Sequence, residues 1–539
     1  MIAVVHLPAR NLLDMLGLAA SLSLQRSIIM ANQSNDQSLN AWRGYQWKDY
    51  LDKSYYFYEA QRSGPLPADN RVKWRKDSCL NDTGPLGQSL VGGHFDSGDH
   101  LKVLFPYGTT TAILAWGVLE FQDGYKTAGQ LDSAMSTLMW ASEFLMEAHF
   151  FKAKVQMSHG GFDQYVAAVG MARFDHPFWG RPEEMDMKRP VYLVDASKPS
   201  SDLLGGAAAG LAATSMVFKK TNATFATRCL LQAQTLYVFA TNQEGKYSDY
   251  GIEQLYPSTT YLDDLAFAAA WMYKATGAYE YLADAHEYWD RSHAEDTANP
   301  FVVWYWDNMI WAVDALLLSL PEPQPKYKYE MEFFFDSWIK GWYGVSYTPL
   351  GLAWTSDWGP LRNAANAGLL ANIYANKLAQ TDQLSAAKLR CWAQKQLRYI
   401  VGDSGKSYVV GMGKYPPTHV HHRAASCPKR PAVCDWSTAF TPAASNPHVL
   451  YGALIGGPHA DDSFTDKRDN FQQNEPALDF NAGYTGLLAA MLSSVQPSCS
   501  VCYCLDTKDP LTCGVPSAPP PPVHSPPPPP KSPKAASHP

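Results

Sequence analysis

The sequence predicts an all-α domain in which paired helices wrap into a toroid. Ala- and Leu-rich runs recur through residues 41–495 with apolar residues at helical spacing, and Gly, Pro and Asp/Asn/Ser loops separate them. We find no serial strand pattern and no alternation of strands with helices. Because each helix must bury its apolar stripe on another element, roughly a dozen helices in one domain favour packing on one another.

Four runs carry the helical prediction most clearly. Asp202 and Asp263 stand where N-caps of two of these helices are expected. The runs are GGAAAGLAATSMVF (205–218), LDDLAFAAAWMYKATG (262–277), MIWAVDALLLSL (309–320) and AANAGLLANIYANKLA (364–379).

Composition is that of a globular protein with a sizeable core, since 46% of the 539 residues are apolar and 18% are charged. The net charge of -7 argues against a nucleic-acid partner, which would require a basic patch or stripe. Aromatic residues are abundant, with 17 Trp, 30 Tyr and 22 Phe. Most of them are expected in the core, but Trp and Tyr exposed in a groove can stack on sugar rings.

The chain divides into four parts. Residues 1–40 are expected to be a leader, with a possible signal peptide, and a polar linker. Residues 41–495 form the predicted globular domain, and residues 496–515 form a short Cys-rich segment. The Pro-rich residues 516–539 are expected to be an extended, disordered spacer.

Secretion is the expected localisation. The sequons at Asn32, Asn81 and Asn222 are compatible with it. Outside the apolar stretch 11–24, no charge-free apolar run of about 18 residues occurs, which predicts no membrane span.

The nine cysteines favour disulfides over a metal site. The four cysteines near the C-terminus do not repeat the paired C-x-x-C spacing of zinc sites. Cys427 and Cys434 flank a short Pro-containing loop that a disulfide between them would close. The odd total leaves at least one cysteine unpaired or bonded to another chain.

Asp96 and Asp99 form the first candidate cluster, in the string VGGHFDSGDH. Glycines on both sides allow the two carboxylates to point into one space. Two nearby carboxylates can hold and deprotonate a water, one staying charged while the other orients it. A calcium loop or a helix cap is the alternative interpretation of this string.

His419, His421, His422 and Arg423 form the second cluster. No partner Cys and no H-E-x-x-H helix is nearby, so zinc is disfavoured. Hydrogen bonds from His and Arg to substrate hydroxyls are favoured over zinc. A surface loop without a function is the remaining alternative.

The third cluster, Phe464–Asn481, is acidic yet rich in aromatic residues, and contains Asp466 and Glu475. A Glu packed against Phe side chains loses solvation and keeps its proton closer to neutral pH, as a general acid requires. A solvated acidic loop that caps the helix beginning near Ala482 is the competing interpretation.

Together the three clusters resemble glycoside hydrolase family nine, the plant, bacterial and animal endoglucanases. LVGGHFDSGDHLKVLFP resembles the family's block around D-A-G-D, with Ser97 in place of Ala. SYVVGMGKYPPTHVHHR resembles its histidine signature, and Phe464–Ala482 fits its acidic signature. Further blocks match in family order, so that the resemblance runs from about Tyr45 to about Leu492.

The resemblance implies an (α/α)6 barrel with a groove across one mouth, and an inverting endo-β-1,4-glucanase acting on cellulose and related glucans. It implies Asp99 as general base, Asp96 as a second ligand of the same water, and Glu475 as general acid. His421 and Arg423 are expected to hydrogen-bond to substrate. Inverting hydrolysis needs its two carboxyl groups about 6.5–9.5 Å apart to admit the water.

The resemblance further implies that Asp466 holds the loop presenting Glu475. Trp358, Arg362, Tyr261 and Asp263 are expected to be subsite contacts. No cofactor is required and no catalytic metal is expected. Calcium is bound by some relatives, but the sequence identifies no ligands for it.

Two departures from the family pattern are visible. Gly206 stands where Glu is common, which is expected to cost helix stability, and Phe480 replaces a frequent Tyr. Three other functions stay open: a non-catalytic glucan-binding wall protein, a hydrolase of another wall β-glucan, and a metal-dependent hydrolase centred on the histidines.

Overall fold

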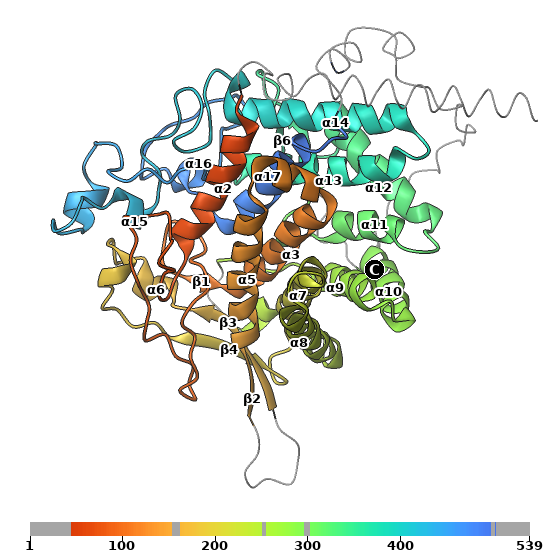
Figure 1. Cartoon of the computed structure of the whole chain (residues 1–539), viewed down its shortest axis with the longest axis horizontal. Coiled ribbons are helices and arrows are strands. Elements are labelled where there is room, and N and C mark those ends of the chain that lie inside the picture. The colour runs from red at the N-terminus through yellow and green to blue at the C-terminus, as the bar shows by residue number, and fades with distance from the viewer. Residues whose placement is uncertain (1–44, 153–161, 251–254, 296–301, 497–501, 503–539) are drawn as a thin grey trace, which may run out of the picture.

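The computed structural model of the chain describes residues 45–152, 162–250, 255–295, 302–496 and 502 (Figure 1). The predicted leader, most of the Cys-rich segment and the predicted Pro-rich tail lie outside these residues. The globular domain predicted for residues 41–495 therefore contains nearly everything described below.

Six helices form a closed inner ring in the described part of the chain. Each packs on the next, and the last returns to the first (Figure 1). In ring order they are α3 (Leu104–Glu120), α7 (Ser201–Phe218), α9 (Leu262–Thr276), α11 (Ile310–Ser319), α13 (Pro360–Leu378) and α17 (Leu478–Met491).

Six further helices pack outside this ring, each against one or two inner helices. The architecture is an (α/α)6 barrel, as predicted. The outer helices are α2 (Trp47–Gln61), α5 (Leu131–Glu147), α8 (Ala223–Asn242), α10 (Tyr279–Glu295), α12 (Pro325–Lys340) and α14 (Gln383–Arg398).

Small residues set the spacing of the inner ring. A Cβ at Gly108 of α3 would lie 2.5 Å from the backbone N of Ala207 of α7, so the two helices meet where one lacks a side chain. Gly206 lies in this crossing and is fully buried against Thr109. Its small size therefore serves close helix packing, which offsets the lower helix propensity of glycine.

Helix α7 is long and apolar enough to cross a membrane by length and composition alone. In the structure 89% of it is buried inside the protein. Its apolar character is accounted for by its place in the inner ring.

A four-stranded antiparallel sheet lies beside the barrel, which the sequence did not predict. Its central strand β3 (Phe162–Val169) pairs with β1 (Lys102–Val103), β2 (His149–Lys152) and β4 (Val191–Asp195). β1 directly precedes α3, whereas the other three strands lie between α5 and α7, so the strands do not repeat along the chain, and β1 has only two residues. Short strands of this kind leave no detectable period in the sequence.

The predicted N-caps at Asp202 and Asp263 are each wrong by two positions: the caps are Ser200 and Tyr261. Both aspartates lie in the first helical turn. Their carboxylates accept hydrogen bonds from other segments instead, Asp202 from the backbone N–H of Tyr247 and Asp263 from that of Met309. The two aspartates therefore connect neighbouring loops to the inner helices and do not serve as N-caps.

Two disulfides are present among the described residues. Cys427 and Cys434 are bonded, as the sequence suggested. Cys391 on α14 is bonded to Cys502, so the Cys-rich segment is attached to the barrel by at least this residue.

The other described elements are short. They are α4 (Gln122–Ala128), α6 (Ala172–Asp175), η1 (Pro182–Glu184), η2 (Tyr247–Tyr250), β5 (Ser346–Tyr347), β6 (Ala353–Trp354), η3 (Tyr399–Asp403), α15 (Arg423–Ser426), η4 (Trp436–Phe440) and α16 (Phe471–Asn474).

Candidate active site

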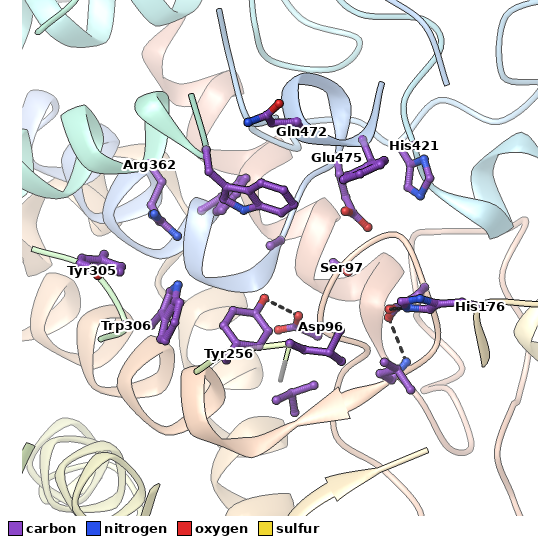
Figure 2. A pocket seen from close by; sticks show the side chains of 18 of the residues that line it. Asp96, Ser97, His176, Tyr256, Tyr305, Trp306, Arg362, His421, Gln472 and Glu475 are labelled. Atoms are coloured by element: carbon purple, nitrogen blue, oxygen red, sulfur yellow. Dashed lines mark hydrogen bonds and ion pairs between the residues drawn. The ribbon is translucent and has the colours of Figure 1, made fainter. Parts of the chain in front are cut away.

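A groove with a volume of about 800 Å³ opens at the N-terminal ends of the inner helices. All three clusters singled out in the sequence contribute to its wall (Figure 2). Its aromatic residues are Trp179, Tyr256, Tyr305, Trp306, Trp358, Trp436, Phe471 and Phe480.

Asp99 lies in the floor of the groove as a charged carboxylate. Its Oδ1 accepts from the backbone N–H of Leu101 at 3.0 Å, and its Oδ2 lies 3.3 Å from Nε2 of His176. Burial alone would raise the pKa of Asp99, but the hydrogen bond from His176 and the nearby positive charge of Arg423 lower it below its usual value.

Asp96 is in the opposite electrostatic state. Its Oδ2 accepts from the Tyr256 hydroxyl at 2.5 Å, and the residue is almost fully buried. Burial raises the pKa of Asp96 well above its usual value, and the neighbouring carboxyl groups of Asp479 and Asp99 add to this. The two aspartates are thus separated into one ionised and one proton-retaining group.

Glu475 reaches the same loop from the far end of the chain. Its Oε1 accepts from the backbone N–H of Gly98 at 3.0 Å. Burial raises the pKa of Glu475, although His421 and the hydrogen bond from Gly98 partly oppose the rise. A carboxylic acid that keeps its proton beside an ionised Asp99 is the arrangement that general acid and base chemistry requires.

Gly98 makes this approach sterically possible. A Cβ at this position would lie 2.0 Å from the carbonyl oxygen of His421 and 2.9 Å from Oε1 of Glu475. The glycine between the two aspartates therefore serves close backbone approach.

Asp466 binds the two loops that flank the general-acid candidate. Its carboxylate accepts from the backbone N–H groups of Thr418 and His419 and from the side-chain amide of Asn474. Burial raises the pKa of Asp466, but these hydrogen bonds outweigh it and lower the value. Asn474 directly precedes Glu475, so the Asp466 carboxylate is hydrogen-bonded to the residue next to the general-acid candidate.

His421 lies beside Glu475 in the groove (Figure 2). Its Nδ1 is 2.6 Å from the carbonyl oxygen of Arg468, so Nδ1 carries the donated proton. In the neutral ring Nε2 is then the acceptor.

Arg423 lines the groove, but its guanidinium forms a buried ion pair with Asp175. It contributes positive charge close to Asp99. The ion pair involves only Nη1, so the expected hydrogen bond from Arg423 to substrate stays a prediction.

Trp358 and Arg362 line the groove as expected. Tyr261 and Asp263 are outside it, and their assignment as subsite contacts is corrected. The Tyr261 hydroxyl donates to Glu244, and Asp263 is buried beneath Met309. Both belong to the start of α9, whose first turn faces the neighbouring loops.

Sequence reasoning missed Asp175 and His176. The register of the sheet explains their position, since Lys102 of β1 pairs with Val169 of β3. Asp99 shortly precedes β1 and Asp175 follows β3, so the pairing brings both to one place. No local motif signals this contact, because it depends on the unpredicted sheet.

One group of possible metal ligands occurs among the described residues: Asp99, Asp175 and His176, with ligand atoms within 4.8 Å of one another. The ion pair from Arg423 already supplies positive charge to it. The three histidines at 419, 421 and 422 form no such group.

Comparison with known proteins agrees with this geometry. The sequence profile described as "Glycosyl hydrolase family 9" matches residues 47–488. Endoglucanase A of Bacillus pumilus is 37% identical over an alignment of 462 residues that covers 83% of this chain and 66% of that protein. The chain thus spans about two thirds of the length of that relative.

Solved structures give the same result. A termite endoglucanase from Nasutitermes takasagoensis is 42% identical with a TM-score of 0.77, covering 83% of this chain and 99% of that one. Endoglucanase CelQ from Clostridium thermocellum, solved with cellotetraose, is 31% identical with a TM-score of 0.71, covering 82% and 70%.

The (α/α)6 barrel and its carboxylate-lined groove define a glycoside hydrolase. The chain belongs to glycosyl hydrolase family 9 and is an enzyme of the cellulase type.

Proposed function

We propose that the chain hydrolyses internal β-1,4-glucosidic bonds of cellulose and related glucans by single displacement with inversion. The observation that carries the proposal is the opposite electrostatic state of two carboxyl groups in one groove. The hydrogen bond from His176 lowers the pKa of Asp99 against the effect of burial, burial raises the pKa of Glu475, and the backbone of Gly98 lies between them.

Glu475 acts as the general acid. It donates its proton to the glycosidic oxygen as the bond to C1 breaks, which removes the need to expel an alkoxide. His421 approaches the leaving group or a sugar hydroxyl with Nε2, and Asp466 keeps the loop of Glu475 in place.

Asp99 acts as the general base. It takes a proton from a water that attacks C1 from the opposite face, and the configuration is therefore inverted. Asp96, fixed by Tyr256, orients this water through its second carboxyl oxygen. His176 and Arg423 keep Asp99 ionised.

The substrate class follows from the aromatic walls of the groove. Flat rings stack on the apolar faces of pyranose units. Arg362 lies among them in a buried ion pair with Asp479. The cellotetraose complex of CelQ supports a groove that takes several glucose units.

Hydrolysis needs no catalytic metal in this proposal, because side chains supply both acid and base. A structural calcium ion stays a prediction without identified ligands. Secretion is supported by the two disulfides, which persist in oxidising compartments.

The test is hydrolysis of carboxymethylcellulose and cello-oligosaccharides by Glu475→Gln, with Asp469→Asn as control because Asp469 is an exposed acid in the same loop. Glu475→Gln should lower turnover by at least about 10²-fold with an unchanged melting temperature. NMR of the first products should show the α-anomer. An inactive wild-type protein that still binds glucan would favour the non-catalytic wall protein, and retained turnover in the variant would remove Glu475 from the acid role.

A further inference from the structure

The loop closed by Cys427 and Cys434 borders the groove. Residues 428–433 between the cysteines are exposed or half-buried, so the loop has no apolar core of its own. Besides the disulfide, the guanidinium of Arg181 holds it by donating to the carbonyl oxygens of Pro428 and Ala432 at 2.6 and 2.9 Å. Arg430 adds ion pairs at the surface, which contribute little to stability.

In the sequence, the disulfide precedes by two residues a tryptophan that lines the groove. Asp435 follows Cys434, and its carboxylate caps the turn η4 by accepting from the backbone N–H groups of Ser437 and Thr438. Trp436 is the first residue of that turn. Only Asp435 separates the disulfide from Trp436, so the disulfide and the capped turn together position the Trp436 side chain.

Trp436 offers the groove an apolar ring rather than a hydrogen-bond donor. Its Nε1–H donates to the carbonyl oxygen of Pro177 at 2.7 Å, so the polar atom is satisfied within the protein. The side chain lines the groove and the residue is 40% exposed. An exposed indole whose N–H is occupied is suited to stacking on the apolar face of a pyranose ring.

A buried second indole supports this ring. Trp179 is only 3% exposed, its ring centroid lies 5.1 Å from that of Trp436, and its Nε1–H donates to Ser426 at 2.9 Å. Trp179 also contacts His421 at 5.2 Å between centroids. The disulfide loop is therefore connected through Trp179 to the residues beside Glu475.

We propose that Trp436 stacks on a glucose unit at the His176 end of the groove, and that the Cys427–Cys434 disulfide positions it for this contact. Trp436 contacts substrate directly, whereas the two cysteines and Trp179 are positioning residues. The inference rests on the proposed glucanase function and adds a specificity determinant to it. Oligosaccharides gain affinity from this contact once they are long enough to place a glucose unit on the Trp436 ring while the reacting bond lies between Asp99 and Glu475.

The test measures KM and kcat for cellotriose through cellohexaose. Trp436→Ala should raise KM about tenfold for cellohexaose, the value of one aromatic contact of about 1.4 kcal/mol, and less for shorter chains. Trp436→Phe should recover part of the loss. The double variant C427S/C434S should raise KM with the same length dependence and a nearly unchanged kcat.

The matched control opens the other disulfide. C391S/C502S removes a cross-link on α14, outside the groove, and should retain wild-type KM at every length. Equal KM values for wild type and Trp436→Ala at all lengths would overturn the stacking contact. A KM shift in Trp436→Ala but none in C427S/C434S would overturn the positioning by the disulfide. Failure of the glucanase proposal is recognised separately, since wild type itself would then cleave none of these oligosaccharides.

Discussion

The backbone N–H of Gly98 donates a hydrogen bond of 3.0 Å to Oε1 of Glu475, across 377 positions of sequence. The loop that carries the base candidate Asp99 thereby also holds the acid candidate. This one contact determines how closely the two carboxyl groups can approach a bound sugar from opposite sides.

Gly98→Ala should damage activity more than stability. Its methyl group would collide with the carbonyl of His421, and overpacking of this kind costs about 1–3 kcal/mol. Displacing Glu475 by even an ångström is expected to lower kcat about 10²-fold. Kinetics on carboxymethylcellulose and thermal unfolding measure the two effects.

Gly129→Ala is the control for that substitution. Gly129 lies outside the groove and has a positive φ of 69°, unlike Gly98, and its Cβ would meet nothing within 4 Å. The variant should lose about 1–2 kcal/mol of stability from backbone strain and keep its turnover. Equal loss of turnover in both variants would show that lowered stability, not the contact with Glu475, explains the effect.

Ser97→Ala should move the alkaline limb of the pH–rate profile to higher pH. The Ser97 hydroxyl stabilises the ionised form of Glu475 and so lowers the pKa that burial raises. Removing the hydroxyl raises this pKa further, and the general acid then keeps its proton to higher pH. The measurement is kcat/KM against pH, and a shift of this limb to lower pH would contradict the assignment.

His176→Gln should instead move the acidic limb to higher pH. The hydrogen bond from His176 is the largest influence that lowers the pKa of Asp99 against the effect of burial. Without the imidazolium the base protonates at a higher pH, so activity is lost earlier on acidification. An unchanged acidic limb, with Ser97→Ala as the comparison, would remove His176 from this role.

Asp466→Asn should loosen the loops on both sides of the acid. The ionised carboxylate accepts hydrogen bonds from Thr418, His419 and Asn474, and hydrogen bonds to charged groups contribute about 1.5–3 kcal/mol. Because folding lowers the pKa of Asp466, its contribution is present above the unfolded pKa and is lost as pH falls through the folded value. Urea unfolding at neutral and acidic pH should therefore show a difference between variant and wild type that shrinks in acid.

The fold class was predictable because inner-ring helices such as α7 and α9 repeat one apolar pattern along the chain. The sheet was not, since β1 has two residues and leaves no period. The N-caps were misplaced by two positions, since Asp202 and Asp263 lie in the first helical turn and their carboxylates also accept hydrogen bonds from distant loops.

The sequence by itself determined which chemical groups are present: the Gly-flanked aspartates, the glutamate in its aromatic loop and the histidine segment are each local strings. Only the folded structure shows that the pKa of Asp96 is raised while that of Asp99 is lowered, that His176 belongs to the site, and that Tyr261 does not. The physical reason is that ionisation and contact depend on burial and on neighbours hundreds of residues away, which the barrel and the sheet register bring within a few ångströms.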